Sequence, residues 1–272
     1  MCIAGILLNV HPDVPLLLFH NRDETAERAF HTASFGASPT NGLVCALDTE
    51  CGGTWMGANP SAGRVAMLTN VRGGTIVGAT SRGVLVTGAL LGDLNTTLQG
   101  SYRGFNLVVA ETHGGRVRME YATNGPVGEG LGHREVSDGV HTLCNSFLDD
   151  MSWPKTSHLQ RRSEDVLRPM LMASVMSVPQ LVSAAAGLLC ETPGFTKEQI
   201  PNPTGCENEP FFQRDIYTFA DVPSGGHFQT CCQSVVVVYR ESSSSSFALA
   251  YWYRRTHTPT HHDEWTTVTM PL

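Results

Sequence analysis

The order of segment types along the chain predicts an α+β fold, in which helices flank two stacked, mainly antiparallel sheets. Short apolar segments with strand character come first, with one helical segment among them; two more helical segments follow, and strands return after residue 234. No segment repeats another. Strands, then helices, then strands are typical of two packed sheets with helices outside them.

A chain of 272 residues could form one large domain or two small ones. Residues 191–226 are rich in Pro, Gly and acidic groups, and they indicate a long excursion rather than a linker between domains. We therefore expect a single domain over residues 1–272.

Hydrophobic patterning predicts the individual elements. Apolar segments predict strands over residues 2–10, 14–20, 43–47, 54–57, 65–69, 105–110, 116–121, 140–144, 235–239, 247–254 and 266–270. Apolar residues near helical period predict helices over 81–98, with Ser81 as N-cap, over 157–173 and over 177–190. The glycine-rich loop that opens at Arg72-Gly73-Gly74 lacks the P-loop pattern, so no phosphate is assigned to it.

Composition narrows the classes of function. The net charge of −7 and the pI of about 5.8 argue against sequence-independent binding of nucleic-acid phosphates. No apolar run approaches the length of a membrane span, and the first residues lack the basic segment of a targeting signal. Eight cysteines without C-x-x-C spacing favour reduced thiols, so a cytoplasmic location is expected.

The first two predicted strands carry the most informative pattern, because they flank the turn sequence His11-Pro12-Asp13. If they pair as an antiparallel hairpin centred near Pro12, the numbers of paired residues sum to about 24, and their Cβ atoms lie roughly 5 Å apart. This register places Cys2 opposite Arg22, with Asn21 and Asp23 beside it.

A cysteine at this position has the chemistry of an N-terminal nucleophile. Removal of Met1 would leave Cys2 with a free α-amino group, whose pKa of about 7.7–8.0 suits a general base for its own thiol. A guanidinium facing the sulfur would lower the thiol pKa, and an adjacent carboxylate would hold the ammonium or orient the arginine. The alternative is that Cys2 is a small core residue, while Asn-Arg-Asp-Glu caps a helix with a surface ion pair.

Five short motifs carry a resemblance to a known family. They are Met1-Cys2-Ile3, Asn21-Arg22-Asp23-Glu24, Gly52-Gly53-Thr54-Trp55, Thr69-Asn70 and Gly104-Phe105-Asn106-Leu107. Their order resembles that of the transport and Golgi organisation protein 2 family, also called the NRDE family. The resemblance runs from residue 1 to the closing His262-Asp263-Glu264-Trp265.

That family is similar to N-terminal nucleophile hydrolases of the penicillin V acylase and bile salt hydrolase type. The resemblance implies a four-layer αββα sandwich and leaves two functions open. One is an N-terminal cysteine hydrolase or acyltransferase acting on an amide, ester or thioester. The other is a non-catalytic protein that binds and traffics haem, a lipid or acyl-coenzyme A in the same cleft. For either function, the resemblance also implies an association with the Golgi or mitochondria.

Two asparagines complete the candidate catalytic set. Asn70 and Asn145 each close an apolar strand and begin a loop, where a side-chain amide can point into a cleft and donate to an oxyanion. The alternative is an asparagine that only caps a strand end. The resemblance implies oxyanion and substrate contacts for both, beside Cys2, Arg22 and Asp23.

Asn21, Glu24 and Trp55 are the candidates for substrate binding. Arginine and aspartate are adjacent here, whereas the acylases separate them by two residues. Asp23 and Glu24 are therefore alternatives for the carboxylate role, and Asn21 and Arg22 are alternatives for the role of the arginine. For Trp55, a core anchor is the alternative.

One further segment departs from the family pattern, and another contains residue types that bind metals. Where related sequences carry an arginine that would help to hold transition-state charge, this chain has Cys231. His261-His262-Asp263 could bind a metal, but a solvated turn is expected near a chain end, so no metal is assigned. No C-x-x-C-H haem attachment signature occurs.

Overall fold

The computed structural model describes most of the chain. The described residues are 2–28, 30–31, 42–71, 77–113, 115–125, 131–173, 177–201, 215–221, 226–241, 246–258 and 260–272. Met1, the glycine-rich loop at residues 72–74, most of the hairpin tip at 242–246 and much of the excursion at 191–226 lie outside these residues.

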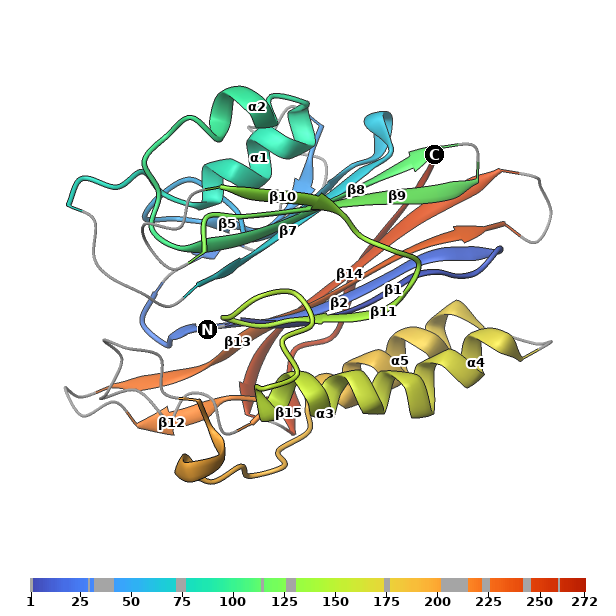
Figure 1. Cartoon of the computed structure of the whole chain (residues 1–272). Helices are drawn as coiled ribbons and strands as arrows, with labels where there is room; N and C mark the ends of the chain where they lie inside the picture. Colours follow the sequence, from blue (N-terminus) through green and yellow to red (C-terminus); the bar gives the residue numbers. More distant parts are fainter. Residues whose placement is uncertain are drawn as a thin grey trace.

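Both ends of the chain contribute to an antiparallel eight-stranded sheet (Figure 1). Its order is β11-β1-β2-β13-β14-β15, with β12 paired to β13 and β16 paired to β14. The strands are β1 (Cys2–His11), β2 (Val14–Thr25), β11 (Gly139–Leu143), β12 (Phe219–Asp221), β13 (His227–Arg240), β14 (Phe247–Thr258), β15 (His261–His262) and β16 (Thr266–Pro271). Strands β1 and β2 are central and covered on both faces, which explains why they are apolar along most of their length.

The second sheet has six antiparallel strands in the order β10-β9-β8-β7-β6-β4. These are β4 (Val44–Cys45), β6 (Met56–Asn59), β7 (Arg64–Asn70), β8 (Phe105–His113), β9 (Arg116–Thr123) and β10 (Gly132–Glu135). Strand β3 (Phe30–His31) pairs with β5 (Leu47–Asp48) in a separate ribbon. The single strand predicted over residues 43–47 is therefore wrong, because β4 and β5 pair with different partners.

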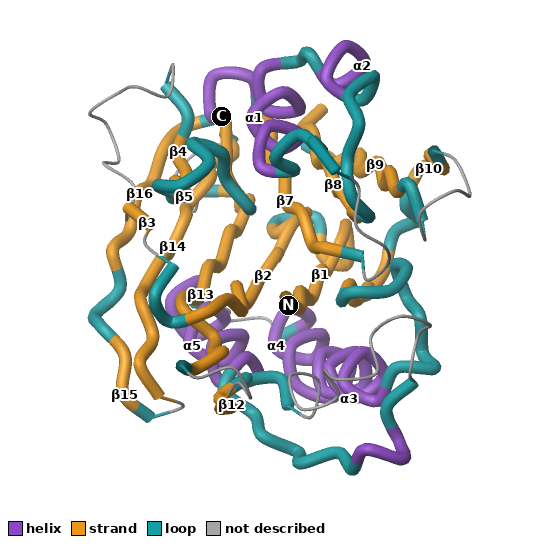
Figure 2. Tube along the Cα trace, turned by 90° about the vertical axis from the view of Figure 1, so that its left-hand side faces the viewer, coloured by secondary structure: helices purple, strands orange, loops and turns teal. Residues whose placement is uncertain are grey.

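Helices cover the outer face of each sheet (Figures 1 and 2). Helices α1 (Gly83–Leu91) and α2 (Leu94–Thr97) lie on the six-stranded sheet. On the eight-stranded sheet lie α3 (Pro154–Arg162), which continues through a π-helical turn (Ser163–Leu167) into α4 (Arg168–Met172), and α5 (Val178–Leu189). Short 3-10 turns occur at Pro60–Ala62 and Lys197–Gln199.

The helix predicted over residues 81–98 is wrong in two respects. It begins after Arg82, not Ser81, and no side chain caps it. It is also interrupted at Gly92, whose φ of 88° is left-handed and ends α1 before α2 starts. Glycine adopts this conformation without the steric cost that a Cβ brings, so the break is encoded locally.

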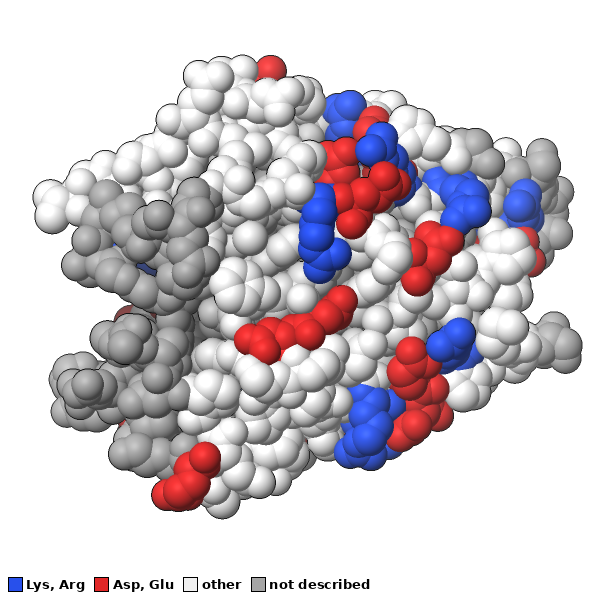
Figure 3. Space-filling model, viewed as in Figure 1, with Lys and Arg blue, Asp and Glu red and all other residues white. Residues whose placement is uncertain are grey.

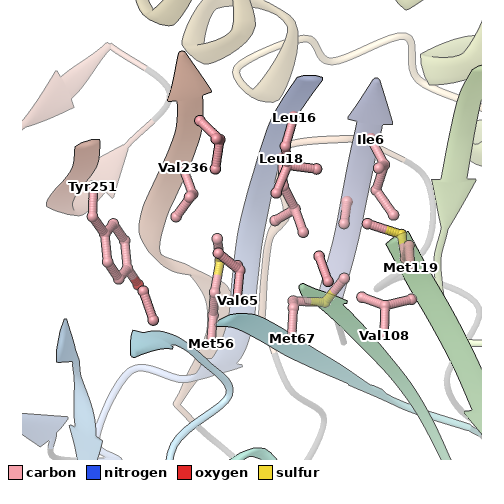
Figure 4. Close-up of a cluster of buried hydrophobic side chains, with 14 of the residues drawn as sticks. Ile6, Leu16, Leu18, Met56, Val65, Met67, Val108, Met119, Val236 and Tyr251 are labelled. Carbon is pink, nitrogen blue, oxygen red and sulfur yellow. The ribbon is translucent and has the colours of Figure 1, made fainter. Parts of the chain in front are cut away.

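Three apolar layers separate the four structural layers. One lies between the sheets, one between the eight-stranded sheet and α3–α5, and one between the six-stranded sheet and α1. In β1 and β2, even-numbered side chains such as Ile6, Leu16 and Leu18 enter the layer between the sheets, where Met67 and Met119 approach from the other sheet (Figure 4). The αββα sandwich expected from the sequence is confirmed.

The register of the first hairpin is also confirmed. Cys2 pairs with Arg22, and the sum of 24 holds as far as Leu8 with Leu16. A register shift at the turn then pairs His11 with Val14. Because directly opposed side chains project from the same face of a sheet, Cys2 and Arg22 point to the side that faces the second sheet.

Charges on the face shown in Figure 3 are mixed, with acidic and basic side chains interspersed. Exposed pairs such as Arg118 with Glu135, at 3.2 Å, are typical of a solvated surface. Within the described residues, no helix is long and apolar enough to cross a membrane.

Candidate active site

A cavity of about 270 Å³ lies where β1 begins and β2 and β7 end. It brings together residues that are far apart in the sequence. The lining includes Cys2, Arg22, Asp23, Glu24, Arg28, Asp48, Cys51, Trp55, Asn70, Arg82, Gly83 and Arg103. Six of the eight residues proposed from the sequence therefore line one cavity; Asn21 and Asn145 are the two that do not.

Cys2 is the first described residue of β1, and it is only 6% exposed. Burial raises the pKa of its thiol, although the backbone N–H of Asp23 and the guanidinium of Arg22 both act to lower it. Arg22 lowers the thiol pKa, as expected from the sequence, but burial raises it by more, because an apolar environment disfavours the thiolate. At neutral pH the thiol therefore retains its proton.

Arg22 is held by an acidic and an aromatic partner. Its Nη2 donates to Asp48 Oδ2 at 3.1 Å, and its guanidinium lies over the rings of Trp55 and Phe30, at 4.4 and 5.2 Å from their centroids. Its Nη1 is buried and has no hydrogen-bond partner among the described residues. Arg22 thus presents one unused donor in a cavity that also contains Cys2.

Asp48 anchors a second arginine. Arg28 Nε donates to Asp48 Oδ2 at 2.8 Å, and the backbone N–H groups of Glu50 and Cys51 donate to Oδ1. Burial acts to raise the pKa of Asp48, but these contacts and the charges of Arg28 and Arg22 lower it overall. An ionised Asp48 therefore orients Arg22, a role that the sequence suggested for a neighbour of Arg22 in the same strand.

Asp23 points away from Arg22, as alternation along β2 requires. Its carboxylate accepts hydrogen bonds from Thr230 Oγ1 at 2.7 Å and Thr218 Oγ1 at 3.1 Å. Burial raises the pKa of Asp23, while the buried ammonium of Lys155 acts to lower it. Glu24 instead lies 3.8 Å from Arg28, so the two carboxylates that the sequence left as alternatives have different neighbours.

The two asparagines are coupled to each other. Asn145 Nδ2 donates to the backbone carbonyl of Asn70 at 2.7 Å, so Asn145 holds the end of β7. Thr69 Oγ1 donates to the Cys144 carbonyl at 2.5 Å, which joins the same two segments a second time. The side-chain amide of Asn70, by contrast, has no partner within the described part of the chain and lines the cavity.

Asn21 lies on the opposite face of β2. Its amide donates to the carbonyls of Leu189 and Ile216 and accepts from Gln233, so it joins β2 to α5 and to the segment before β12. Trp55 lines the cavity, and its Nε1 has no partner among the described residues.

Cys231, which stands where the family pattern leads us to expect arginine, is buried outside the cavity lining. Its sulfur lies 3.6 Å from the Glu24 carbonyl. Four charged lining residues were not among the candidates from the sequence: Arg28, Asp48, Arg82 and Arg103. They belong to no recognised motif, and only tertiary folding brings them to Cys2. Among the described residues, no group of three or more His, Cys, Asp or Glu side chains could hold a metal ion.

Comparison with known proteins agrees with the motifs. None of the curated proteins compared with the chain matches it. The sequence model of the family described as Transport and Golgi organisation 2 matches residues 1–251, which is most of the chain. The chain therefore belongs to the Transport and Golgi organisation 2 family.

Proposed function

We propose that this protein is an N-terminal cysteine acyl-transfer enzyme, which cleaves an amide, ester or thioester through an acyl-Cys2 intermediate. One observation carries the proposal: Cys2, Arg22 and Asn70, which are far apart in the chain, line one cavity. A thiol, a guanidinium with an unused donor and an amide that has no partner among the described residues are the groups that acyl transfer needs.

The first step follows from the state of the thiol. Because burial keeps the Cys2 thiol protonated, the sulfur needs a base. The free α-amine that removal of Met1 would leave belongs to the same residue and can act as that base. The thiol proton passes to this amine, the sulfur–carbon bond forms, and the carbonyl oxygen becomes an oxyanion. The ammonium then protonates the leaving group as its bond to carbon breaks, and water or a second acceptor releases the acyl group.

The other residues have roles that their contacts support. The Asn70 amide donates to the oxyanion, where one such donor contributes about 3–4 kcal/mol. Asn145 positions Asn70 through its backbone carbonyl. Arg22, oriented by Asp48, stabilises the developing negative charge. Asp23 holds the α-ammonium, because its carboxylate lines the same cavity and is near enough to Cys2 to act on it as a charge.

Intact-mass spectrometry with thioester and activated-ester acyl donors tests the proposal. We expect one acyl adduct, located on Cys2, that is absent from Cys2→Ala. Cys51→Ala is the matched control, because Cys51 lines the same cavity and is exposed, so its adduct should be unaffected. Reversible binding of an acyl ligand that persists in Cys2→Ala, without any adduct, would support the carrier alternative and refute catalysis.

A further inference from the structure

The cavity carries more positive charge than the protein around it. The chain has a net charge of −7, yet four arginines and three carboxylates line the cavity. These are Arg22, Arg28, Arg82 and Arg103, against Asp23, Glu24 and Asp48. The ion pairs already described neutralise Arg22 and Arg28 through Asp48 and Glu24.

Arg82 and Arg103 form no ion pair with any residue in the described part of the chain. Glu24 is near enough to act on Arg82 as an opposite charge, but its ion-pair partner is Arg28, at 3.8 Å. Arg82 is half-buried, and its Nη1 donates to the backbone carbonyl of Gly104 at 3.0 Å, which fixes the guanidinium in place. Arg103 is near enough to act on Arg82 as a like charge. Two neighbouring guanidiniums that line a cavity favour an anion there, because it relieves their mutual repulsion.

The N-terminus of α1 adds to the positive potential that Arg82 and Arg103 create in the cavity. Gly83, its first residue, lines the cavity, no side chain caps the helix, and its first turn contains no acidic residue. The start of α1 packs closely on Gly53: a Cβ atom at position 53 would lie 2.7 Å from Gly83 Cα. The N-terminus of a nine-residue helix and two guanidiniums therefore lie around the same space.

We infer that Arg82, Arg103 and the start of α1 form a subsite for an anionic group, a carboxylate or a phosphate, carried by the acyl substrate. This inference rests on the proposed function for the acyl part of the substrate. The anionic subsite itself depends only on the arginines.

Alkylation of Cys2 tests the subsite without turnover. Iodoacetate and iodoacetamide both transfer a carbon to sulfur with loss of iodide, but only iodoacetate is an anion. Measured by peptide mass spectrometry at low salt, the rate ratio of iodoacetate to iodoacetamide at Cys2 should exceed that of a free thiol by about tenfold. It should fall several-fold in Arg82→Gln and in Arg103→Gln, and recover in Arg82→Lys.

Arg118→Gln is the matched control, because Arg118 is exposed on β9, is paired with Glu135 and lies outside the cavity lining. The ratio should be unchanged in this variant and should approach the free-thiol value in 1 M salt for the wild type. A wild-type ratio equal to that of a free thiol, or equal losses in Arg118→Gln and Arg82→Gln, would overturn the subsite.

A second measurement separates this subsite from the proposed function and identifies the anion. Calorimetric titration with dodecanoate, dodecyl phosphate and neutral dodecanol should show binding of one or both anions that weakens about tenfold in Arg82→Gln. The anion that binds more tightly shows whether the subsite accepts a carboxylate or a phosphate. Anion binding without any acyl adduct on Cys2 would refute catalysis and keep the subsite. Acyl adducts that form equally from anionic and neutral donors, in wild type and Arg82→Gln, would refute the subsite and keep catalysis.

Discussion

Replacement of Asp48 by asparagine isolates the contribution of one carboxylate that orients two arginines. Asp48→Asn keeps the shape of the side chain but removes the charge that faces Arg22 at 3.1 Å and Arg28 at 2.8 Å. The Arg22 side chain is only 5% exposed, so its guanidinium would remain buried without a counterion. Breaking a buried pair in this way typically costs about 3–5 kcal/mol.

Two features reduce that cost. The cation–π contacts of Arg22 with Trp55 and Phe30 survive the substitution and contribute about 1–2 kcal/mol. Arg28 keeps Glu24 and Glu50 within 4 Å. We therefore expect Asp48→Asn to lower the free energy of unfolding by about 2–4 kcal/mol at pH 7.

Urea unfolding over a range of pH checks both the magnitude and the cause. The pKa of Asp48 is lowered in the folded protein, so its contribution to stability is present above the unfolded pKa of about 3.9 and is lost as pH falls through the folded value. The difference between wild type and Asp48→Asn should accordingly shrink in acid.

Glu50→Gln is the control, because Glu50 lies 3.7 Å from the same Arg28 but its side chain is 58% exposed. It should cost less than about 1 kcal/mol. The reasoning fails if Asp48→Asn costs no more than Glu50→Gln, or if its cost does not change with pH.

Three further outcomes are expected. Asn145→Ala should reduce the rate of Cys2 acylation roughly 10–100-fold and leave ligand affinity nearly unchanged, because it frees the end of β7 that carries Asn70. Single-turnover kinetics in which the acylation rate and the ligand affinity fall equally would contradict this role. An uncleaved N-terminal extension should abolish acylation, since an amide nitrogen cannot act as a base, whereas the same extension at the C-terminus should not. His141→Gln should destabilise the protein more at pH 5 than at pH 9 in urea titrations. Burial acts to lower the pKa of His141, but its contacts with Asp149 raise it overall, so its stabilisation is present below about 6.5 and is lost as pH rises through the folded value.

Local rules were enough to predict the first half of the site. A hairpin centred near Pro12 gives the sum of 24 that pairs Cys2 with Arg22, although the turn itself pairs His11 with Val14 and the register shifts between His11 and Leu8. Alternation along a strand fixes which neighbours share their face. The same alternation separates Asn21 from Arg22 once the register is known, because adjacent residues on β2 project to opposite sides. Gly92 also carried a local signal for the end of α1, which the apolar periodicity of residues 81–98 concealed.

The second half of the site depends on contacts that no local pattern encodes. Asp48 meets Arg22 only because the β3–β5 ribbon folds against the end of β2, and Arg82 enters the cavity only because α1 begins beside Gly53. Asn145 is a related case: its position at a strand end was visible, but its hydrogen bond to the Asn70 backbone depends on how the two sheets approach one another. Sequence periodicity fixes which face a residue occupies, not which distant residue lies opposite it.

The electrostatics of the cavity favour proton transfer over a preformed thiolate in the proposed reaction. Burial raises the pKa of the Cys2 thiol even though a guanidinium is available, so Arg22 does not ionise the sulfur in the resting protein. Burial also raises the pKa of Asp23, and a neighbouring ammonium would favour its charged form. When the Cys2 amine takes the thiol proton, it becomes the cation that Asp23 is placed to receive. Arg22 and Asn70 are then left to stabilise the charge that develops on the substrate, where a dry site gives each donor its greatest effect.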